Sequence, residues 1–208
     1  MFEVAEVGKT LDKATYKLEV PRLRTALLDM QERLSASPLA VVVVVAGVEG
    51  AGKSETVNML QSWLDARGIE IHATQKESQE ESERPPMWRF WRMLPPKGRI
   101  GIFLGSWYTL PIVNQVFERT SPGEFNRSLD DVVEFERMLS EEGVQIVKLW
   151  MHISKKEQRK RLKNFESDEE QSWRVTKQDW KFFKRYQDFT RVSEEALRST
   201  SQGYSPWH

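Results

Sequence analysis

Apolar residues along this chain gather in four short runs that are separated by longer amphipathic stretches. The runs are rich in Val, Ile and Leu, and they cover residues 41–45, 69–73, 100–104 and 144–153. Runs of this length and composition predict buried β-strands. Because helical patterns separate the strands, the order favours βαβ units, in which a parallel sheet is covered by helices on both faces.

The stretches between the strands show the three- and four-residue spacing of amphipathic helices. The first pattern opens at Pro21 and continues through Leu23, Leu27, Met30 and Leu34. A polar break at residues 35–38 separates it from the first strand. A second pattern follows the first strand and consists of Val57, Leu60 and Leu64. We therefore expect one α/β domain over residues 1–208, with a helical lead-in at about 1–37.

The first strand runs into a glycine-rich turn with the spacing Gly47-x-x-x-x-Gly52-Lys53-Ser54. This spacing is typical of a phosphate-binding loop, because the glycines let backbone N–H groups converge on phosphate oxygens. Lys53 adds a positive charge among those oxygens, and Ser54 can reach a magnesium ion at the start of the following helix.

A glycine-rich turn after a strand can also be no more than a tight connection. Here a strand pattern precedes the turn and a helical pattern follows it, which is the context that a phosphate-binding loop requires. We therefore expect phosphate to be bound by Gly47, Gly50, Ala51, Gly52, Lys53 and Ser54.

The charged residues balance one another, so the chain as a whole has no strong electric field. It has 31 basic and 31 acidic side chains among 208 residues, and 39% of the residues are hydrophobic. A neutral chain is not drawn to nucleic acid or to a membrane surface, and we expect neither as a partner. No apolar run is long enough to span a bilayer and no signal peptide is recognisable, so we expect a cytoplasmic location. The absence of cysteine excludes disulfides and thiolate metal sites.

Tryptophans and histidines are weaker candidates for function. The tryptophans could stack on nucleotide bases, but large aromatic side chains more often fill a core. We expect Trp150, within the fourth strand, to be a core residue. His72 and His152 lack partner ligands at metal-site spacing, so we interpret them as ordinary core or surface histidines.

Glu134 and Glu136 lie two residues apart in a helical pattern, so they cannot share a helix face. At most one of them should therefore point into a site. The other is expected to be solvated or paired with Arg137.

A cationic run follows the fourth strand. Ser154 and Glu157 predict a capping box that begins a helix, and residues 155–163 carry six basic side chains and one acidic side chain. Such a run is often only the solvated face of a helix. Its position after a late strand also fits a lid that closes over bound phosphates, and the sequence leaves both interpretations open.

Several short motifs join the phosphate loop in a specific order. They are Trp88-Arg89-Phe90-Trp91-Arg92, Ser106-Trp107-Tyr108, Glu134 to Leu139, Lys148-Leu149-Trp150, Glu157-Gln158-x-x-Arg161, and Trp173-Arg174-Val175-Thr176 ahead of Asp179. Together they resemble the polyphosphate kinase 2 family, which transfers phosphoryl groups between inorganic polyphosphate and nucleotides, over roughly residues 15–207. Residues 1–8 are similar to the start of the two-module members, the polyphosphate:AMP phosphotransferases. We therefore expect the N-terminal module of a longer chain.

The resemblance implies a three-layer P-loop kinase-like domain with a parallel sheet and a small helical lid near residues 154–185. Lys53 would hold phosphate, and Arg92 would contact the transferred group or the acceptor nucleotide. The lid over polyphosphate would include Arg159, Lys160, Arg161 and Lys163. Phosphoryl transfer needs in-line positioning and cations around the equatorial oxygens, so no covalent nucleophile is required.

Two departures from the family pattern concern magnesium, the cofactor that the resemblance implies. The family has Asp-Arg-Ser-Trp-Tyr at the end of the third strand, whereas this chain has Leu104-Gly105 in place of Asp-Arg. Glu49 stands where active members carry Asp, and the added methylene displaces a metal ligand by about 1 Å. Ser54 and Glu49 remain as magnesium ligands, with Lys53, Arg92 and Glu49 as the catalytic set. We expect this module alone to be catalytically weak or silent.

The sequence leads to one principal function and two alternatives. The principal one is a phosphotransferase module that moves phosphoryl groups between inorganic polyphosphate and AMP or ADP. The first alternative is a non-catalytic module that binds polyphosphate or supports the assembly of a two-module enzyme. The second is an ATP-dependent nucleoside-monophosphate kinase. A second homologous module and further copies of the chain, in a homo-oligomer, are the protein partners that we consider.

Overall fold

The sheet is parallel and has four strands in the order β2-β3-β1-β4. The computed structural model describes residues 1–6, 8 and 10–208. The strands are β1 (Ala40–Gly47), β2 (Ile69–Ala73), β3 (Ile100–Leu104) and β4 (Val144–Met151). In the central strand β1, Val43 pairs with Ile102 of β3 on one side and with Val147 of β4 on the other. The four predicted strands are confirmed, and β2 and β3 have the predicted bounds.

The predicted end of β4 is wrong by two residues. The strand stops at Met151 because Ser154, in extended conformation, already caps the next helix and accepts a hydrogen bond from the backbone N–H of Glu157 at 3.3 Å. Further along, the last residues of the chain run beside β4. His208 donates its backbone N–H to the carbonyl of Lys148, and Trp150 donates to the carbonyl of His208.

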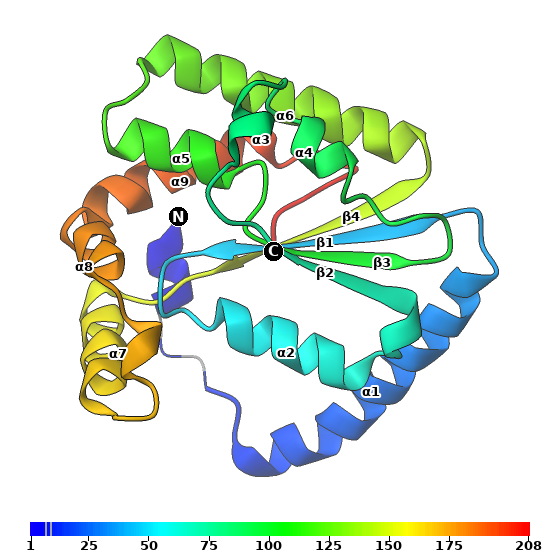
Figure 1. Cartoon of the computed structure of the whole chain (residues 1–208). Helices are drawn as coiled ribbons and strands as arrows, with labels where there is room; N and C mark the ends of the chain where they lie inside the picture. Colours follow the sequence, from blue (N-terminus) through cyan, green and yellow to red (C-terminus); the bar gives the residue numbers. More distant parts are fainter. Residues whose placement is uncertain (7, 9) are drawn as a thin grey trace.

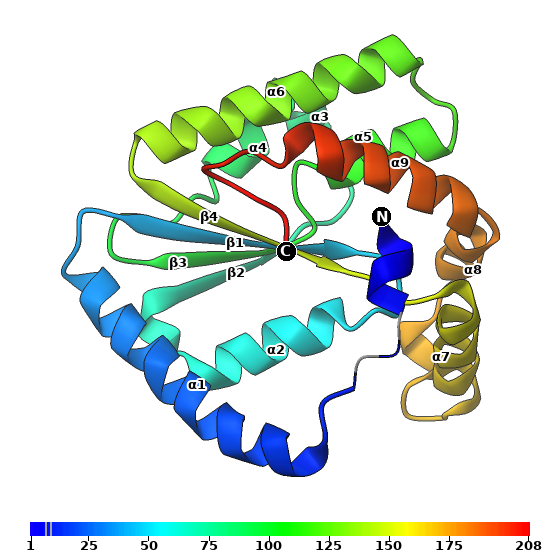
Figure 2. The ribbon, with the colours of Figure 1, turned by 180° about the vertical axis from the view of Figure 1, so that it is seen from behind.

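Helices cover both faces of the sheet, as the sequence pattern predicts (Figures 1 and 2). One face carries α1 (Lys13–Ser35) and α2 (Lys53–Trp63). The other carries α5 (Thr109–Val116), α6 (Pro122–Glu141) and α9 (Tyr186–Thr200). Beyond the carboxyl ends of the strands stand α7 (Lys155–Ser167), η3 (Ser172–Arg174) and α8 (Lys177–Lys184). The shorter elements are η1 (Phe2–Glu6), η2 (Ala66–Gly68), α3 (Gln79–Ser82) and α4 (Trp88–Trp91).

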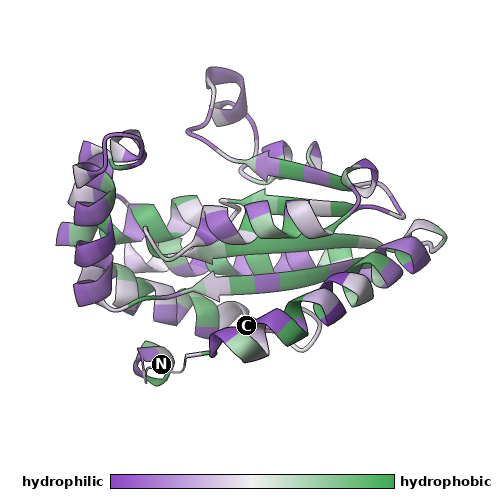
Figure 3. Ribbon diagram, turned by 90° about the horizontal axis from the view of Figure 1, so that it is seen from below, coloured by the Kyte–Doolittle hydropathy of each residue, from purple (hydrophilic) through white to green (hydrophobic). Residues whose placement is uncertain are grey.

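Alternate residues of β1 point to opposite faces and so belong to two separate cores. Val42 and Val44 belong to the larger core, which is closed by α5, α6 and α9. Val45 belongs to the smaller core, which includes Leu34 of α1 and Val57 of α2. The strands are mostly apolar, whereas the outer helices alternate between apolar and hydrophilic residues (Figure 3).

Helix α1 begins at Lys13, so the prediction that it opens at Pro21 is wrong. Asp12 caps the helix, and its carboxylate accepts hydrogen bonds from the N–H groups of Ala14 and Thr15 at 2.9 and 3.0 Å. Pro21 lies inside the helix at an exposed position. Water can therefore solvate the carbonyl that the missing N–H leaves free, which makes an interior proline tolerable.

A buried ion pair lies within the larger core, between α6 and β4. Glu136 and Lys148 have fully buried side chains, and their Oε2 and Nζ atoms are 2.7 Å apart. Lys148 also donates to the hydroxyl of Tyr108 at 2.9 Å and to the carbonyl of Thr200 at 2.8 Å. Glu136 further accepts hydrogen bonds from Trp107, Tyr108 and Ser205. This network joins α5, α6, β4, α9 and the C-terminal segment.

Burial and the charge of Glu136 shift the pKa values of Lys148 and Tyr108. Burial lowers the pKa of Lys148, and the adjacent Glu136 carboxylate opposes that change. Burial also raises the pKa of Tyr108 far above its usual value, and the negative charge of Glu136 raises it further. Tyr108 therefore stays protonated and donates to Glu136. As predicted, Glu134 and Glu136 do not share a face, because Glu134 lies at the surface and pairs with Arg137.

The buried pair yields a prediction about stability. Lys148→Met should lower the free energy of unfolding by about 3–5 kcal/mol, because it leaves the Glu136 carboxylate buried without a counter-charge. The double variant Glu136→Gln with Lys148→Met should recover most of the loss. Urea unfolding measures both, and Arg137→Gln, which removes exposed ion pairs with Glu134 and Glu141, serves as the control with little effect. A Lys148→Met variant as stable as the parent would contradict the prediction.

Candidate active site

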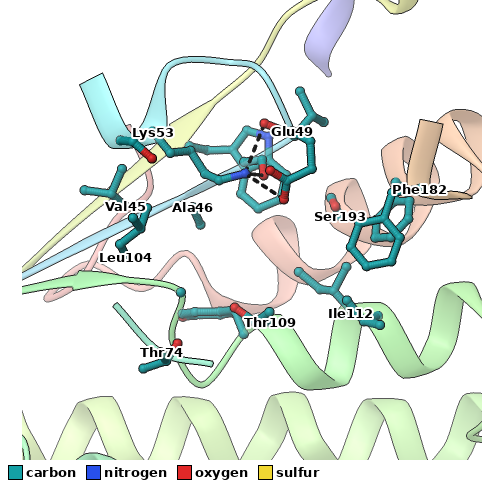
Figure 4. Close-up of a pocket in the computed structure, with 18 of the residues that line it drawn as sticks. Val45, Ala46, Glu49, Lys53, Thr74, Leu104, Thr109, Ile112, Phe182 and Ser193 are labelled. Carbon is teal, nitrogen blue, oxygen red and sulfur yellow. Dashed lines mark hydrogen bonds and ion pairs between the residues drawn. The ribbon is translucent and has the colours of Figure 1, made fainter. Parts of the chain in front are cut away.

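A cavity of about 330 Å³ opens at the carboxyl ends of the strands. In open α/β sheets, ligands bind at this edge. The residues after β1 form one side of the cavity, and residues of α5, α8 and α9 form the other (Figure 4). Lining residues from these elements include Glu49, Lys53, Thr109, Ile112, Phe182 and Ser193.

The loop after β1 has the conformation that its glycines permit. Gly47, Gly50 and Gly52 have φ angles of 133°, 74° and 97°, which favour glycine. At Gly47 a Cβ atom would lie 2.0 Å from the carbonyl oxygen of Met151, so β4 leaves room for no side chain there. Gly52 is the N-cap of α2, and Lys53 is its first residue. The predicted strand-loop-helix arrangement is therefore present.

Lys53 is fully engaged by acceptors of its own loop. Its Nζ atom donates to the carbonyls of Gly47 at 2.9 Å and Val48 at 3.2 Å, and it lies 3.0 Å from Oε1 of Glu49. The Glu49 carboxylate thus takes a place beside Lys53 that a phosphate oxygen would need. Ser54, in the first turn of α2, is exposed.

Helix α7 packs directly against this loop. Arg161 donates from Nη1 to the carbonyl of Gly50 at 3.0 Å, and Gln158 donates from Nε2 to the carbonyl of Glu49 at 2.9 Å. An ion pair between Arg174 and Glu55 joins η3 to α2. The structure therefore brings Arg161 to the phosphate loop from more than a hundred residues away in the sequence.

The predicted capping box at the start of α7 is only half present. Ser154 accepts the N–H of Glu157, but the Glu157 carboxylate pairs with Arg161 at 3.3 Å, one turn further on. The other predicted lid residues, Arg159, Lys160 and Lys163, are exposed on α7. Their contact with polyanion stays a prediction.

The structure does not place Arg92 in the cavity lining. Its guanidinium lies over the ring of Trp88, 4.8 Å from the centroid, and the side chain is exposed. Trp150 packs against the larger core, as expected, but it also lines the cavity. His72 packs against Phe103, and His152 lies 2.8 Å from Glu6.

The end of β3 presents an apolar side chain to the cavity. Leu104 lines the cavity, and Gly105 follows it with a φ angle of 81°. A Cβ atom on Gly105 would lie 2.4 Å from Oγ1 of Thr74. A longer side chain at position 105 would therefore be strained by its own backbone and would also displace Thr74.

The donor atoms of this cavity fit a magnesium ion poorly. Mg²⁺ takes oxygen ligands, usually one or two carboxylates together with substrate phosphates and water. Among the described lining residues, Glu49 supplies the one carboxylate, and Lys53 already neutralises it. Leu104 offers no ligand atom where a second carboxylate would face the loop.

Sequence reasoning missed several lining residues, among them Thr74, Thr109, Ile112, Phe182 and Ser193. Thr74 follows β2 directly, so the rule that ligands bind at strand ends could have identified it. The residues of α8 and α9 carry no comparable signal, because their helical pattern fits a core face equally well.

Known proteins are similar to this chain over nearly its whole length. The model of the polyphosphate kinase 2 family matches residues 10–208. The chain belongs to the polyphosphate kinase 2 family. Within the part of the chain that the structure describes, no helix is long and apolar enough to cross a membrane.

Relatives in this family include longer proteins. A polyphosphate:AMP phosphotransferase of Pseudomonas aeruginosa is 45% identical over 209 residues, which cover 100% of this chain and 42% of the relative. An AMP/ADP-polyphosphate phosphotransferase of Meiothermus ruber is 30% identical over 187 residues, covering 89% of this chain and 70% of the relative. A crystal structure described as a polyphosphate kinase 2 from Pseudomonas aeruginosa PA01 superposes with a TM-score of 0.88 at 42% identity, covering 100% of this chain and 42% of that chain.

The chain thus spans less than half the length of the Pseudomonas relative. The fold of this polyphosphate kinase 2 chain, a three-layer α/β P-loop kinase-like fold with a parallel sheet, is that of the solved family structure. Leu104 and Gly105, at the end of β3, therefore lie within this family fold.

The ion pair inside the phosphate loop yields a testable prediction. Glu49→Gln should raise the affinity for tripolyphosphate by up to about fivefold, because partly exposed ion pairs are worth roughly 0.2–1 kcal/mol and their loss frees Lys53. Calorimetry at fixed ionic strength measures the change. Glu80→Gln, an equal charge change on the exposed helix α3, is the control. If Glu49→Gln binds tripolyphosphate no more tightly than the parent, Glu49 does not compete with phosphate.

Proposed function

We propose that this chain is a module of a polyphosphate-dependent phosphotransferase that binds inorganic polyphosphate and AMP or ADP and transfers phosphoryl groups slowly. Family membership supports the reaction class, because the matched relatives are named for phosphoryl transfer between polyphosphate and nucleotides. The observation that carries the slow rate is the apolar, glycine-constrained end of β3 at Leu104 and Gly105.

Phosphate binding rests on the loop and on α7 together. The N–H groups around Gly50 and the N-terminus of α2 favour an anion, whatever stands at position 104. Lys53 and Arg161 contact the loop from opposite sides, one from α2 and the other from α7. A polyanion bound there would compete with Glu49 for Lys53 and gain a second cation in Arg161.

The α7–α8 segment, residues 154–185, would act as a lid over a longer polyphosphate chain. Its inner side is already fixed to the loop by Gln158 and Arg161. Its exposed cations, Arg159, Lys160 and Lys163, are available to phosphates beyond the first few. Exposed charges act through screened electrostatics, so their contribution should depend strongly on salt.

Slow transfer follows from the charges that the site lacks. In the transition state the transferred phosphoryl group spreads its charge over three oxygens, and positioned cations supply most of its stabilisation. With Leu104 and Gly105 at the end of β3 and Arg92 over Trp88, the cations close to the loop are Lys53 and Arg161 among the described residues. Magnesium, the family cofactor expected from the sequence, finds a poor donor set here.

A second candidate function is support of a larger assembly. The Pseudomonas relative continues well beyond the matched part, since the chain covers 42% of it. A module that binds polyphosphate without turning it over could hold the polyphosphate for a second homologous module or for another copy of the protein in a homo-oligomer. Binding without turnover would favour this candidate over the first. Transfer from ATP but not from polyphosphate would favour a nucleoside-monophosphate kinase instead.

The lid proposal predicts a change in salt dependence. The triple variant Arg159→Gln, Lys160→Gln and Lys163→Gln should bind long polyphosphate more weakly, and its affinity should fall less steeply as salt is added. Calorimetry or fluorescence titration between low and high salt measures the slope. The matched control removes three exposed cations of α1, with Lys13→Gln, Lys17→Gln and Arg24→Gln. An equal slope in the lid variant and the parent would contradict the lid proposal.

The slow-transfer proposal predicts that a carboxylate at the end of β3 increases the rate. In single-turnover transfer from polyphosphate to AMP, Leu104→Asp should be at least about tenfold faster than the parent in the presence of magnesium, since metal-assisted charge stabilisation is worth several kcal/mol. The control is Leu104→Asn, because an Asn side chain has nearly the same shape as Asp but carries no charge. Gly105 is left unchanged because its backbone favours glycine. A parent rate near 1–100 per second, as in typical kinases, would refute the proposal.

A further inference from the structure

The two ends of the α7–α8 segment, residues 154–185, meet the body of the protein at one place. Residues 152–154 join β4 to α7, and Tyr186 begins α9 directly after the segment. The hydroxyl of Tyr186 donates to the carbonyl of Ile153 at 2.9 Å and lies 3.4 Å from Nε2 of His152. The two connections therefore touch each other and form a joint at the base of the segment.

Element η1, at the other end of the sequence, lies against this joint (Figure 2). The ring of Phe2 is stacked on the ring of His152, with the centroids 4.5 Å apart and the planes at 9°. Oε1 of Glu6 lies 2.8 Å from Nε2 of His152. The backbone N–H of Phe2 donates to the carboxylate of Glu194, in α9, at 3.0 Å. Element η1 therefore contacts the β4–α7 connection and α9 at once.

The contact between η1 and the joint is buried. Phe2 is 6% exposed and the side chain of His152 is 3% exposed, whereas Val4 of the same element is 72% exposed. The ring of Phe2 also stacks on that of Trp150 in β4, with the centroids 5.8 Å apart. Element η1 thus presents one specific face to the joint, and Phe2 anchors it there.

The joint sets the direction in which α7 leaves the sheet. Ser154, two residues after His152, caps α7, and Gln158 and Arg161 in the following turns donate to carbonyls of the phosphate loop. A small rotation at the start of a helix moves the residues further along it by a larger distance. A fixed joint therefore keeps Arg161 at the loop and fixes where the exposed cations of α7 point.

We propose that η1 is a brace for the lid, and that Phe2, Glu6 and His152 are positioning residues for the binding of long polyphosphate. This proposal rests on the proposed function, since the lid is part of that function. The described lining of the cavity contains none of the three residues, so their effect passes through the joint. The brace holds the lid in the position that is competent for binding, and the apparent affinity rises with the fraction of molecules in that position.

Glu6→Gln tests the brace, because simple electrostatics predicts the opposite result. Removal of a negative charge favours a polyanion, whereas a loosened brace should lower the affinity for long polyphosphate about threefold to tenfold. Tripolyphosphate is short enough for the phosphate loop alone, so its affinity should fall less than about twofold. The matched control is Glu3→Gln, an equal charge change at an exposed position of η1. Calorimetry at fixed ionic strength measures these affinities.

Amide hydrogen exchange gives a readout that needs no ligand. In Glu6→Gln and in Phe2→Gln, the amides of α7 should exchange about threefold to tenfold faster than in the parent, because local opening of the lid becomes easier. The amides of β1 should keep the parent rate. Val4→Gln is the control for Phe2→Gln, since Val4 is exposed. Phe2→Met keeps an apolar contact with the ring of His152 and should restore most of the protection.

The outcomes separate the brace from the proposed function. Exchange in α7 at the parent rate in both variants, or equal affinities of Glu6→Gln and Glu3→Gln for long polyphosphate, would overturn the brace. Equal losses for long polyphosphate and tripolyphosphate would also overturn it, because the loop would then be affected. If the parent binds no polyphosphate, the proposed function fails and hydrogen exchange alone decides the brace. Circular dichroism shows whether Phe2→Gln is folded, and Glu6→Gln decides the proposal if it is not.

Discussion

The buried pair of Glu136 and Lys148 holds together the half of the molecule that faces the cavity. Two opposite charges without solvent contact are tolerated only if every remaining donor and acceptor is satisfied. Here Tyr108, Trp107, Ser205 and the carbonyl of Thr200 complete the network. Tyr108 lines the cavity, and its position therefore depends on α6, β4 and α9 at once. The Glu136–Lys148 network therefore stabilises the larger core and also positions Tyr108 in the cavity wall.

A second constraint acts at the phosphate loop, where the chain supplies its own counter-charges. Lys53 is held by two carbonyls and by Glu49, while Arg161 and Gln158 tie the loop carbonyls to α7. These contacts fix the conformation of the loop in the absence of a ligand. A phosphate bound at Lys53 would have to replace the Glu49 carboxylate to reach the ammonium group.

The phosphate loop and the end of β3 differ in what they offer the cavity. The conformation of the loop after β1 depends on the close approach of Gly47 to Met151, which leaves no room for a side chain. At the end of β3, Leu104 and Gly105 offer the cavity neither a carboxylate nor a cation. The Gly105 backbone has a φ angle of 81°, which favours glycine at this position. The residues proposed to bind phosphate therefore differ from those proposed to limit transfer.

The sequence by itself determined the strands, their parallel arrangement and the phosphate loop, because these follow from local periodicity and glycine spacing. The start of α1 at Asp12 was also a local signal, but the proline inside the helix concealed it. Only the tertiary structure decided which distant residues meet. It brought Arg161 and Gln158 to the loop, left Arg92 over Trp88, and placed Phe182 and Ser193 in the cavity. Such contacts depend on how helices pack across the sheet, and no local pattern encodes that packing.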